Sequence, residues 1–312
     1  MRTVIFQTHE SGYAPGITAL PERCFMNYDY LICGHCVRFE LPWTVKLTKE
    51  SAPFLAEPGS FGTPELTVRF SCVDSLTLPS TGGHWHTGAY YTTKEGLGQV
   101  WHCPSRNEPP YCCVEWNKPQ LGQMTCYYVR GQEHHIAYTK NLLELVGLET
   151  LLLYFDTVLL HSALVDWEGK GILFCAPSGT GKSTQAELWR KYTGSRILNG
   201  DRAGICYRQE IWEAWGLPFA GTSGIYCNQS VPLRAVVLLQ QGADNELMHL
   251  RPAEAFRGML PQCNARRWDL GFMNRLTDVL SSLVGCIPTY QLKCRPDVEA
   301  VELLRSVLME VE

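Results

Sequence analysis

The sequence predicts an α/β protein with two domains, a β-rich domain over residues 1–135 and a domain with a phosphate-binding loop (P-loop) over residues 136–312. Short runs of aromatic and β-branched residues, separated by clusters of Gly, Pro and Ser, fill the first domain and are typical of strands. Strand-like and helix-like segments alternate in the second, which indicates helices layered on a sheet. The segment APSGTGKST, residues 176–184, follows a buried strand and precedes a helix.

The length and composition are those of an ordinary globular protein. The 312 residues suffice for two medium-sized domains, and 45% of them are hydrophobic and 19% charged. The formal net charge is -4, and no long run of like charges occurs. This balance argues against nucleic acid or an anionic membrane surface as a partner.

The cysteine content bears on the compartment and on metal binding. The chain has 14 cysteines, and its start lacks the charged and apolar regions of a secretory signal. We therefore expect reduced thiols and a cytoplasmic location. Cys33 and Cys36 have the spacing of zinc ligands, but no second Cys-x-x-Cys pair accompanies them. We interpret the pair as two thiols beside a turn.

The first domain is expected to form an antiparallel sheet, preceded by an extension over residues 1–25 with little structural role. It contains no long stretch with helical periodicity. Its predicted strands are residues 28–32, 37–41, 66–72, 89–93, 99–103, 112–116 and 124–129.

The second domain begins with an apolar segment expected to be one helix from residue 138 to about residue 160. Three carboxylates in it, Glu144, Glu149 and Asp156, would be costly in a bilayer, so we favour a buried helix over a membrane span. Further strands are expected at residues 162–166, 171–176, 196–199, 204–207, 235–240 and 289–294. Further helices are expected at residues 181–192, 252–260, 268–284 and 296–309.

The glycine-rich segment predicts a nucleotide phosphate site. The phosphate-loop pattern is Gly, four residues, then Gly-Lys-Ser/Thr, and here Ala176 stands in place of the first glycine. Gly179 and Gly181 can turn backbone N–H groups around an anion, and the following helix aims its positive end at the same place. The alternative is an ordinary glycine-rich turn before a helix. The predicted nucleotide-binding residues are Ser178, Gly179, Thr180, Gly181, Lys182, Ser183 and Thr184.

Two residues beside this loop are candidates for catalysis. Asp201 ends the next predicted strand, and in a parallel sheet the strand ends face one crevice, so Asp201 can approach the terminal phosphate or its magnesium ion. His161 heads the strand before the loop strand. The alternatives are a turn residue for Asp201 and a buried, backbone-bonded histidine for His161. Arg202 and Arg234 are either phosphate clamps or solvated surface side chains.

Several of these segments together resemble a known family. They are HSALVD (161–166), GILF (171–174), SGTGKS (178–183) and LNGDR (198–202). They are similar to the catalytic core of HPr kinase/phosphorylase, and still more to bacterial HPr-kinase-like serine kinases, whose fold is shared with ATP-dependent phosphoenolpyruvate carboxykinase. The tail IPTYQLKCRPDVEAVELL (287–304) resembles the same group. The resemblance covers about residues 158–310.

The resemblance implies an HPr-kinase-like kinase domain that uses ATP and Mg²⁺. Lys182 would contact the β- and γ-phosphates, Ser183 and Asp201 would hold Mg²⁺, and Asp201 would act as the base toward the accepting serine. His161 would lie near the transferred phosphate. Gly200 stands where the family has the first of two aspartates, and Thr184 where it has an acidic residue. These departures bear on the reverse phosphorolysis and on recognition of HPr, and they leave kinase chemistry in place.

The predicted function is therefore transfer of the γ-phosphoryl group of ATP to a serine or threonine hydroxyl of a protein or peptide. Two alternatives remain: a small-molecule kinase of the free-serine or adenylylsulfate type, and a nucleotide-binding module without transfer activity. Carboxykinase chemistry would need more metal-ligating residues than the sequence offers. The β-rich domain is expected to dock the acceptor or to form a homo-oligomer.

Overall fold

The computed structural model describes residues 25–57, 60, 62–86, 88–94, 97–117, 122–219 and 221–310. The extension predicted for residues 1–25 lies outside this range, apart from Phe25. The chain divides into two compact units, Met1–Leu148 and Glu149–Glu312. The boundary predicted between residues 135 and 136 precedes helix α1 (Thr139–Val146), which belongs to the first unit. Within the described ranges, no helix has the length and apolarity needed to cross a bilayer.

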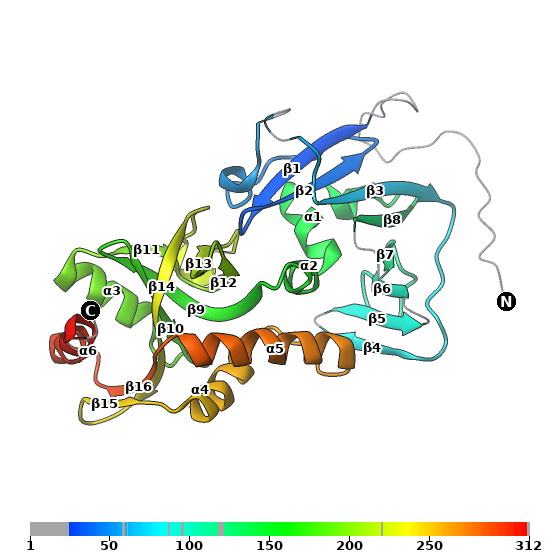
Figure 1. The fold of residues 1–312 in the computed structure, drawn as a ribbon. Coiled ribbons are helices and arrows are strands. Elements are labelled where there is room, and N and C mark those ends of the chain that lie inside the picture. The colour runs from blue at the N-terminus through cyan, green and yellow to red at the C-terminus, as the bar shows by residue number, and fades with distance from the viewer. Residues whose placement is uncertain are drawn as a thin grey trace. The chain divides into compact units, whose positions relative to one another are not determined.

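The first unit is built on one eight-stranded sheet, whose strands are labelled in Figure 1. The strand order across it is β1-β2-β3-β8-β7-β6-β5-β4. The strands are β1 (Met26–Ile32), β2 (His35–Leu41), β3 (Leu66–Val73), β4 (Gly83–His86), β5 (Ala89–Lys94), β6 (Leu97–His102), β7 (Cys112–Asn117) and β8 (Gln123–Val129). Two 3₁₀ helices, Ala52–Phe54 and Glu133–Ile136, accompany it. Each of the seven predicted strands corresponds to one of these, and only the short β4 was not predicted.

The prediction of a purely antiparallel sheet is wrong. Strand β3 pairs in parallel with both β2 and β8, while the other neighbours are antiparallel. The segment between β2 and β3, residues 42–65, is long enough to return the chain to the starting edge, which a parallel connection requires. The alternation of residue types in each strand does not encode this pairing.

An aromatic cluster fills the core of this unit. The buried Trp43 contacts Phe70 and Tyr128 edge-on, with ring centroids 5.6 and 4.6 Å apart. The Tyr30 hydroxyl donates a hydrogen bond of 2.7 Å to the Thr139 carbonyl and so ties α1 to the sheet.

The Cys33/Cys36 motif forms a hairpin turn. Cys33 and Gly34 have φ angles of 51° and 77° and are the two residues between β1 and β2, as in a type I′ turn. Burial raises the pKa of the Cys36 thiol, which disfavours the thiolate that a metal would need. Among the residues that the structure describes, no group of three or more His, Cys, Asp or Glu is arranged so that it could hold a metal ion.

The second unit is a mixed eight-stranded sheet covered on both faces by helices. Its strands are β9 (Val158–Trp167), β10 (Lys170–Cys175), β11 (Arg196–Asn199), β12 (Arg202–Arg208), β13 (Ile211–Gly216), β14 (Ser230–Gln241), β15 (Glu246–His249) and β16 (Thr289–Cys294). Only β10, β14 and β16 run parallel, and all other pairs are antiparallel. The sheet is therefore not the parallel one predicted, and strands β13 and β15 were not predicted.

Strand β9 organises this sheet by changing partners along its length. Its first half, up to His161, pairs with β12, and its second half pairs with β10 on one edge and β11 on the other. Strands β11 and β12 thus follow each other along β9, separated by Gly200 and Asp201. A register shift between Ile197 and Asn199 precedes this break, and such bulges re-aim the residues that follow them.

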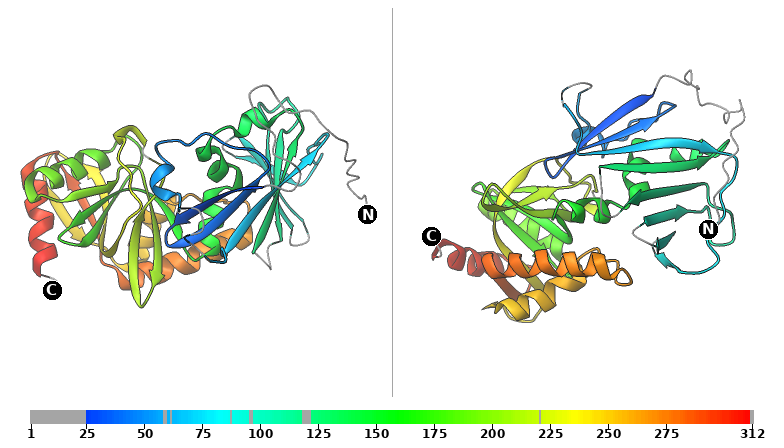
Figure 2. Two further views of the ribbon diagram at one scale, coloured as in Figure 1. Left: turned by 90° about the horizontal axis from the view of Figure 1, so that it is seen from above. Right: turned by 45° about the vertical axis from the view of Figure 1, so that its right-hand side comes forward.

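The helices lie in two layers, as Figures 1 and 2 show. Helices α3 (Lys182–Thr193) and α6 (Val298–Glu310) pack on the face that carries Ala163 and Val165 of β9. Helices α4 (Pro252–Met259) and α5 (Leu270–Cys286), with the 3₁₀ helix Leu260–Gln262, pack on the face that carries Leu164. Alternate residues of β9 therefore face opposite layers, as a strand covered on both sides requires.

The single helix predicted from residue 138 to about 160 is wrong. The chain forms α1, a second helix α2 (Leu148–Tyr154), and then enters β9 at Val158. Gly147 ends α1 with a φ of 65°, the left-handed conformation that glycine adopts most readily. The stretch after Asp156 is rich in leucine because β9 is buried on both faces. Hydrophobicity alone therefore could not distinguish this strand from a buried helix.

Candidate active site

The glycine-rich segment joins the end of β10 to the start of α3. Gly179 and Gly181 have φ angles of 79° and 118°, and a Cβ placed on either would meet nothing within 4 Å. Backbone conformation, not lack of space, is therefore what calls for glycine at both positions. Gly181 is the residue before the first turn of α3, and its carbonyl accepts the Gln185 N–H at 2.9 Å.

Lys182 is folded back onto this loop. Its ammonium donates hydrogen bonds to the carbonyls of Ala176 at 2.8 Å and Pro177 at 3.2 Å, and only 7% of the residue is exposed. Burial lowers the pKa of Lys182, while the nearby Cys175 and Asp201 act in the opposite direction. The positive charge is thus held at the loop with two carbonyl partners that an anion could replace.

A cavity of about 230 Å³ opens between this loop and the Asp201 segment. It is lined by His161, Ser178, Gly179, Gly181, Lys182, Ser183, Thr184, Gly200, Asp201 and Thr222. The structure thus brings together the predicted site residues apart from Thr180, which does not line the cavity and whose N–H approaches the Pro177 carbonyl at 3.3 Å. Thr222 and Gly200 line it although they were not predicted to.

Asp201 and His161 lie side by side across the β9–β12 ladder. His161 pairs with Arg202 in this ladder, and its Nε2 lies 3.5 Å from Oδ1 of Asp201. Arg202 Nε lies 3.3 Å from Oδ2. The interaction with His161, supported by the charges of Arg202 and Lys182, lowers the pKa of Asp201 despite its partial burial. The carboxylate is therefore ionised at neutral pH.

This proximity arises differently from the way predicted. The prediction used strand ends at one edge of a parallel sheet, with His161 at the head of its strand. His161 instead lies inside β9, and the strands that join it to Asp201 are antiparallel. The two residues meet because β9 changes partners at this point, where the Ser162 N–H donates to the Asp201 carbonyl at 3.1 Å.

Asn199 supports Asp201 and was missed as a site residue. Its fully buried Oδ1 accepts the backbone N–H groups of Asp201 and Arg202 at 2.8 and 2.9 Å. Its Nδ2 donates to the carbonyls of Leu217 and Phe219 at 2.7 and 3.1 Å. The available signal was an asparagine in the NGD turn, which was interpreted only as a turn former.

Residues 217–219 and 221–226, which include the 3₁₀ helix Gly221–Ser223, pack over this corner. A Cβ on Gly221 would lie 2.9 Å from Oδ1 of Asp201, so the Gly221 backbone rests directly against the carboxylate. A Cβ on Gly200 would lie 2.0 Å from the Ser223 hydroxyl oxygen. A side chain at residue 200 would clash with Ser223, which accounts for glycine at this position.

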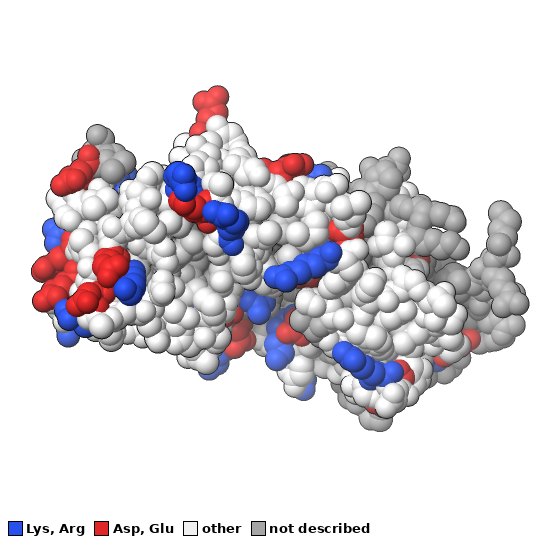
Figure 3. Space-filling view, turned by 90° about the horizontal axis from the view of Figure 1, so that it is seen from below, with Lys and Arg blue, Asp and Glu red and all other residues white. Residues whose placement is uncertain are grey.

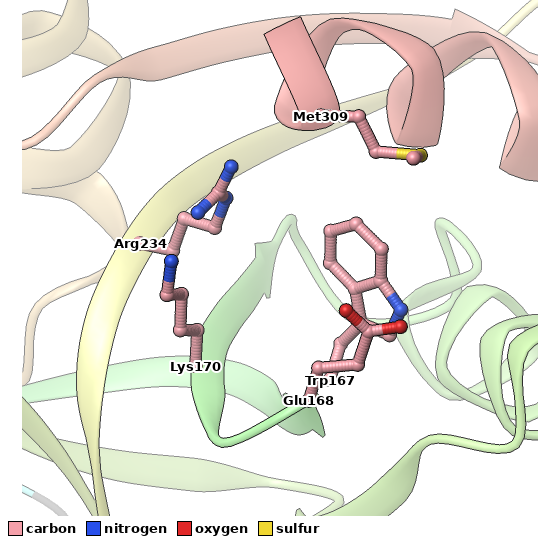
Figure 4. Close-up of a pocket in the computed structure, with 5 residues that line it drawn as sticks. All are labelled: Trp167, Glu168, Lys170, Arg234 and Met309. Atoms are coloured by element: carbon pink, nitrogen blue, oxygen red, sulfur yellow. The ribbon is translucent and has the colours of Figure 1, made fainter. Parts of the chain in front are cut away.

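Arg202 belongs to this corner, whereas Arg234 does not. The Arg202 guanidinium lies 5.0 Å from the centre of the Phe219 ring. Arg234 lies next to Leu233, which pairs with the first part of β10, whereas the glycine-rich loop follows the last residue of β10. It lines a different cavity of about 230 Å³ with Trp167, Glu168, Lys170 and Met309, shown in Figure 4. The clamp role considered for Arg234 therefore does not apply to the Asp201 cavity.

On the face shown in Figure 3, lysines and arginines are interspersed with aspartates and glutamates among the residues drawn in colour. That face carries no continuous basic stripe over the described residues of the kind that a nucleic-acid backbone requires.

The fold and site define a mixed α/β protein in which a strand, a glycine-rich loop and a helix face an ionised aspartate. The model of the family described as "SynChlorMet cassette protein ScmC" matches residues 140–295, half of the chain, and the chain belongs to this family. The structure of the Hpr(Ser) kinase/phosphatase from Coxiella burnetii is distantly similar, with 10% identity and a TM-score of 0.28 over 49% of this chain and 88% of that one. No curated protein sequence matches the chain.

Proposed function

We propose that this protein is a Mg²⁺- and ATP-dependent kinase that transfers the γ-phosphoryl group to a serine or threonine hydroxyl of a protein or peptide. One observation carries the proposal. The glycine-rich loop with Lys182 and Ser183 forms one wall of a cavity, and Asp201 with His161 forms the facing part. Phosphoryl transfer needs this combination of phosphate binding and a carboxylate beside the acceptor.

The loop wall suits a polyphosphate. Backbone N–H groups at the start of α3, the positive end of the helix and the Lys182 ammonium all favour an anion there. The cavity of about 230 Å³ is smaller than the roughly 300–1,000 Å³ of pockets that enclose whole ligands. We infer that it takes the phosphate tail and that the nucleoside lies outside it.

The oxygen donors beside this wall suit Mg²⁺. Ser183 is exposed at the first turn of α3, and Asp201 is ionised, so a hydroxyl and a carboxylate are available to a hard cation that keeps several waters. When bound, Mg²⁺ neutralises charge on the phosphates.

The Asp201 wall suits an acceptor hydroxyl. A carboxylate with a lowered pKa is a weak base, so Asp201 contributes mainly by orienting the hydroxyl and by receiving its proton late in a loose transition state. His161 lies beside Oδ1 of this carboxylate and Arg202 beside Oδ2, so both oxygens are held in place. We expect the first unit to dock the acceptor or to mediate self-association, and the chain to act in the cytoplasm.

The test uses the full-length protein with Mg²⁺ and ATP. Calorimetry measures ATP binding, and transfer is measured with radiolabelled ATP against three probes: synthetic serine- and threonine-containing peptides, free serine and adenylylsulfate. The proposal expects ATP binding and transfer to a peptide. Transfer only to a small molecule would make the protein a small-molecule kinase, and ATP binding without any transfer would make it a binding module; either result would overturn the proposal.

A further inference from the structure

Thr222 is a hydroxyl-bearing residue of the cavity lining that lies outside the glycine-rich loop and the start of α3. The other hydroxyl residues of the lining, Ser178, Ser183 and Thr184, belong to the loop and to α3. Thr222 comes from the segment that packs on Asp201, and it is exposed. Within the described part of the chain, its hydroxyl makes no hydrogen bond, so it is available to a reactant.

Neighbouring contacts hold Thr222 close to the Asp201 carboxylate. The Gly221 backbone rests against Oδ1, as the 2.9 Å approach of a Cβ at that position shows. Consecutive Cα atoms are about 3.8 Å apart, so the Thr222 backbone begins one residue from this contact. Asn199 binds the Leu217 and Phe219 carbonyls on one side, and Ser223 packs on Gly200 on the other.

From this arrangement we propose that Thr222 is a self-phosphorylation site, modified within the same chain. The proposal rests on the proposed function, because a nucleoside triphosphate on the loop supplies the phosphoryl group. The Thr222 oxygen forms a bond to the γ-phosphorus, the bond from that phosphorus to the β,γ-bridging oxygen breaks, and ADP leaves. The hydroxyl proton passes to the Asp201 carboxylate and from there to solvent.

The modification would act as a brake on the site. A phosphothreonine carries a charge of about −1.5 to −2 at neutral pH and three strong acceptor oxygens. Arg202, next to Asp201, could neutralise part of this charge. The remaining charge and bulk would stand beside Asp201, where an outside hydroxyl has to enter. The phosphorylated chain should therefore transfer phosphate to a peptide more slowly than the unmodified chain.

The experiment incubates the full-length protein with Mg²⁺ and ATP in the absence of any acceptor. Intact-mass spectrometry counts the phosphoryl groups, and fragmentation assigns their position. We expect one group on Thr222, added with a first-order rate constant that does not change with protein concentration. A Lys182→Met chain that stays unmodified when incubated alone with ATP should also stay unmodified when mixed with the wild type, because the transfer is internal.

Three variants control for folding and position. Thr222→Val should abolish the modification, and Thr222→Ser, which keeps a hydroxyl, should retain it. Thr277→Val removes a threonine hydroxyl on α5, outside the cavity lining, and should be modified like the wild type. Calorimetry with ATP is run on every variant, so that loss of nucleotide binding is recognised separately.

The outcomes separate this inference from the proposed function. A protein that binds ATP and phosphorylates a peptide but leaves Thr222 unmodified contradicts the self-phosphorylation and leaves the proposed function standing. Modification of Ser223 or of the inactive Lys182→Met chain also contradicts it. Absence of ATP binding contradicts both.

Discussion

The loop wall of the cavity comes from one continuous stretch, residues 176–184, whereas the Asp201 wall is assembled from three separate segments. His161 comes from the middle of β9, Asp201 from the break between β11 and β12, and Thr222 from the segment that packs over them. A local wall needs only its own backbone conformation. An assembled wall needs strand pairing, a buried asparagine and two close-packed glycines, so it should be the more fragile of the two.

The substitution Asp201→Asn should have the largest effect, because it impairs the Asp201 wall and leaves the loop wall intact. The substitution keeps the size of the side chain and removes the charge that receives the proton. Transfer should fall by about 10²–10⁴-fold, the range for loss of a general base. The affinity for ATP measured by calorimetry without Mg²⁺, to which a contact of Asp201 with the metal does not contribute, should change little. Asp156→Asn, at a surface ion pair with Arg275, is the matched control and should leave transfer intact. Equal transfer in both variants would remove Asp201 from catalysis.

Lys182→Met tests the loop wall alone. A hydrogen bond to a charged group contributes about 1.5–3 kcal/mol, so ATP affinity should fall by roughly 10- to 100-fold. The substitution also removes the donor to the buried Ala176 carbonyl, so the thermal midpoint is measured beside the affinity to recognise a loss of folding. Lys191→Met, in the last turn of the same helix, is the control. ATP affinity unchanged by Lys182→Met would contradict the phosphate assignment.

Asn199→Ala tests whether the Asp201 wall depends on its buried support. The change leaves the N–H groups of Asp201 and Arg202 and two carbonyls without their partner. Unsatisfied buried groups cost about 1–3 kcal/mol each, so the free energy of unfolding should drop by about 2 kcal/mol or more in urea titration. The ATP affinity of the folded protein should be retained while transfer falls. A parallel loss of both would mean that the walls are not independent.

Gly221→Ala compared with Gly224→Ala isolates the contact on the carboxylate. Both glycines have positive φ angles, of 52° and 68°, so both alanines incur about 1–2 kcal/mol of backbone strain. Only the alanine at 221 would also press on Asp201, because a Cβ at 224 meets nothing within 4 Å. Transfer should therefore fall in Gly221→Ala and stay near the wild-type rate in Gly224→Ala. Similar rates in the two variants would show that this contact does not position Asp201.

The smallest effect is expected in the pH profile of His161→Gln. His161 is the main cause of the lowered pKa of Asp201, so its removal should raise that pKa. A carboxyl group with a lowered pKa stabilises the fold above its ordinary pKa, and this contribution is lost as the pH falls through the lowered value. Because transfer needs the ionised carboxylate, the acidic limb of the transfer profile should move to higher pH in the variant. An acidic limb at the same pH would rule out His161 as the cause.

The local elements were largely predictable from the sequence, and their pairing was not. Residues 196–199 and 289–294 were predicted as strands and are β11 and β16. Strand β13 was missed because its hairpin turn, Gln209–Glu210, has φ angles of 47° and 68° without the glycine or asparagine that marks such turns. Parallel pairing of β3 with β2 and β8 depends on contacts between distant segments, which the alternation within one strand does not specify.

The same contrast holds for the candidate site. The glycine-rich loop could be found from spacing because the backbone conformations it needs are local. The importance of Asn199 and Gly221 could not be found in this way. It depends on contacts between distant segments, of Asn199 with Leu217 and of Gly221 with Asp201. At residue 200 the sequence showed only a glycine where the resembling family has another residue. The cause is the Ser223 side chain, which packs against Gly200 in the folded chain and leaves no room for a Cβ.

The most direct test of the two-wall cavity is a structure of the full-length protein with Mg²⁺ and a non-hydrolysable ATP analogue. The account predicts the phosphates on the amides before α3, with the terminal phosphate facing Asp201 and the Thr222 hydroxyl. Nucleotide bound elsewhere, or a terminal phosphate turned away from Asp201, would contradict it.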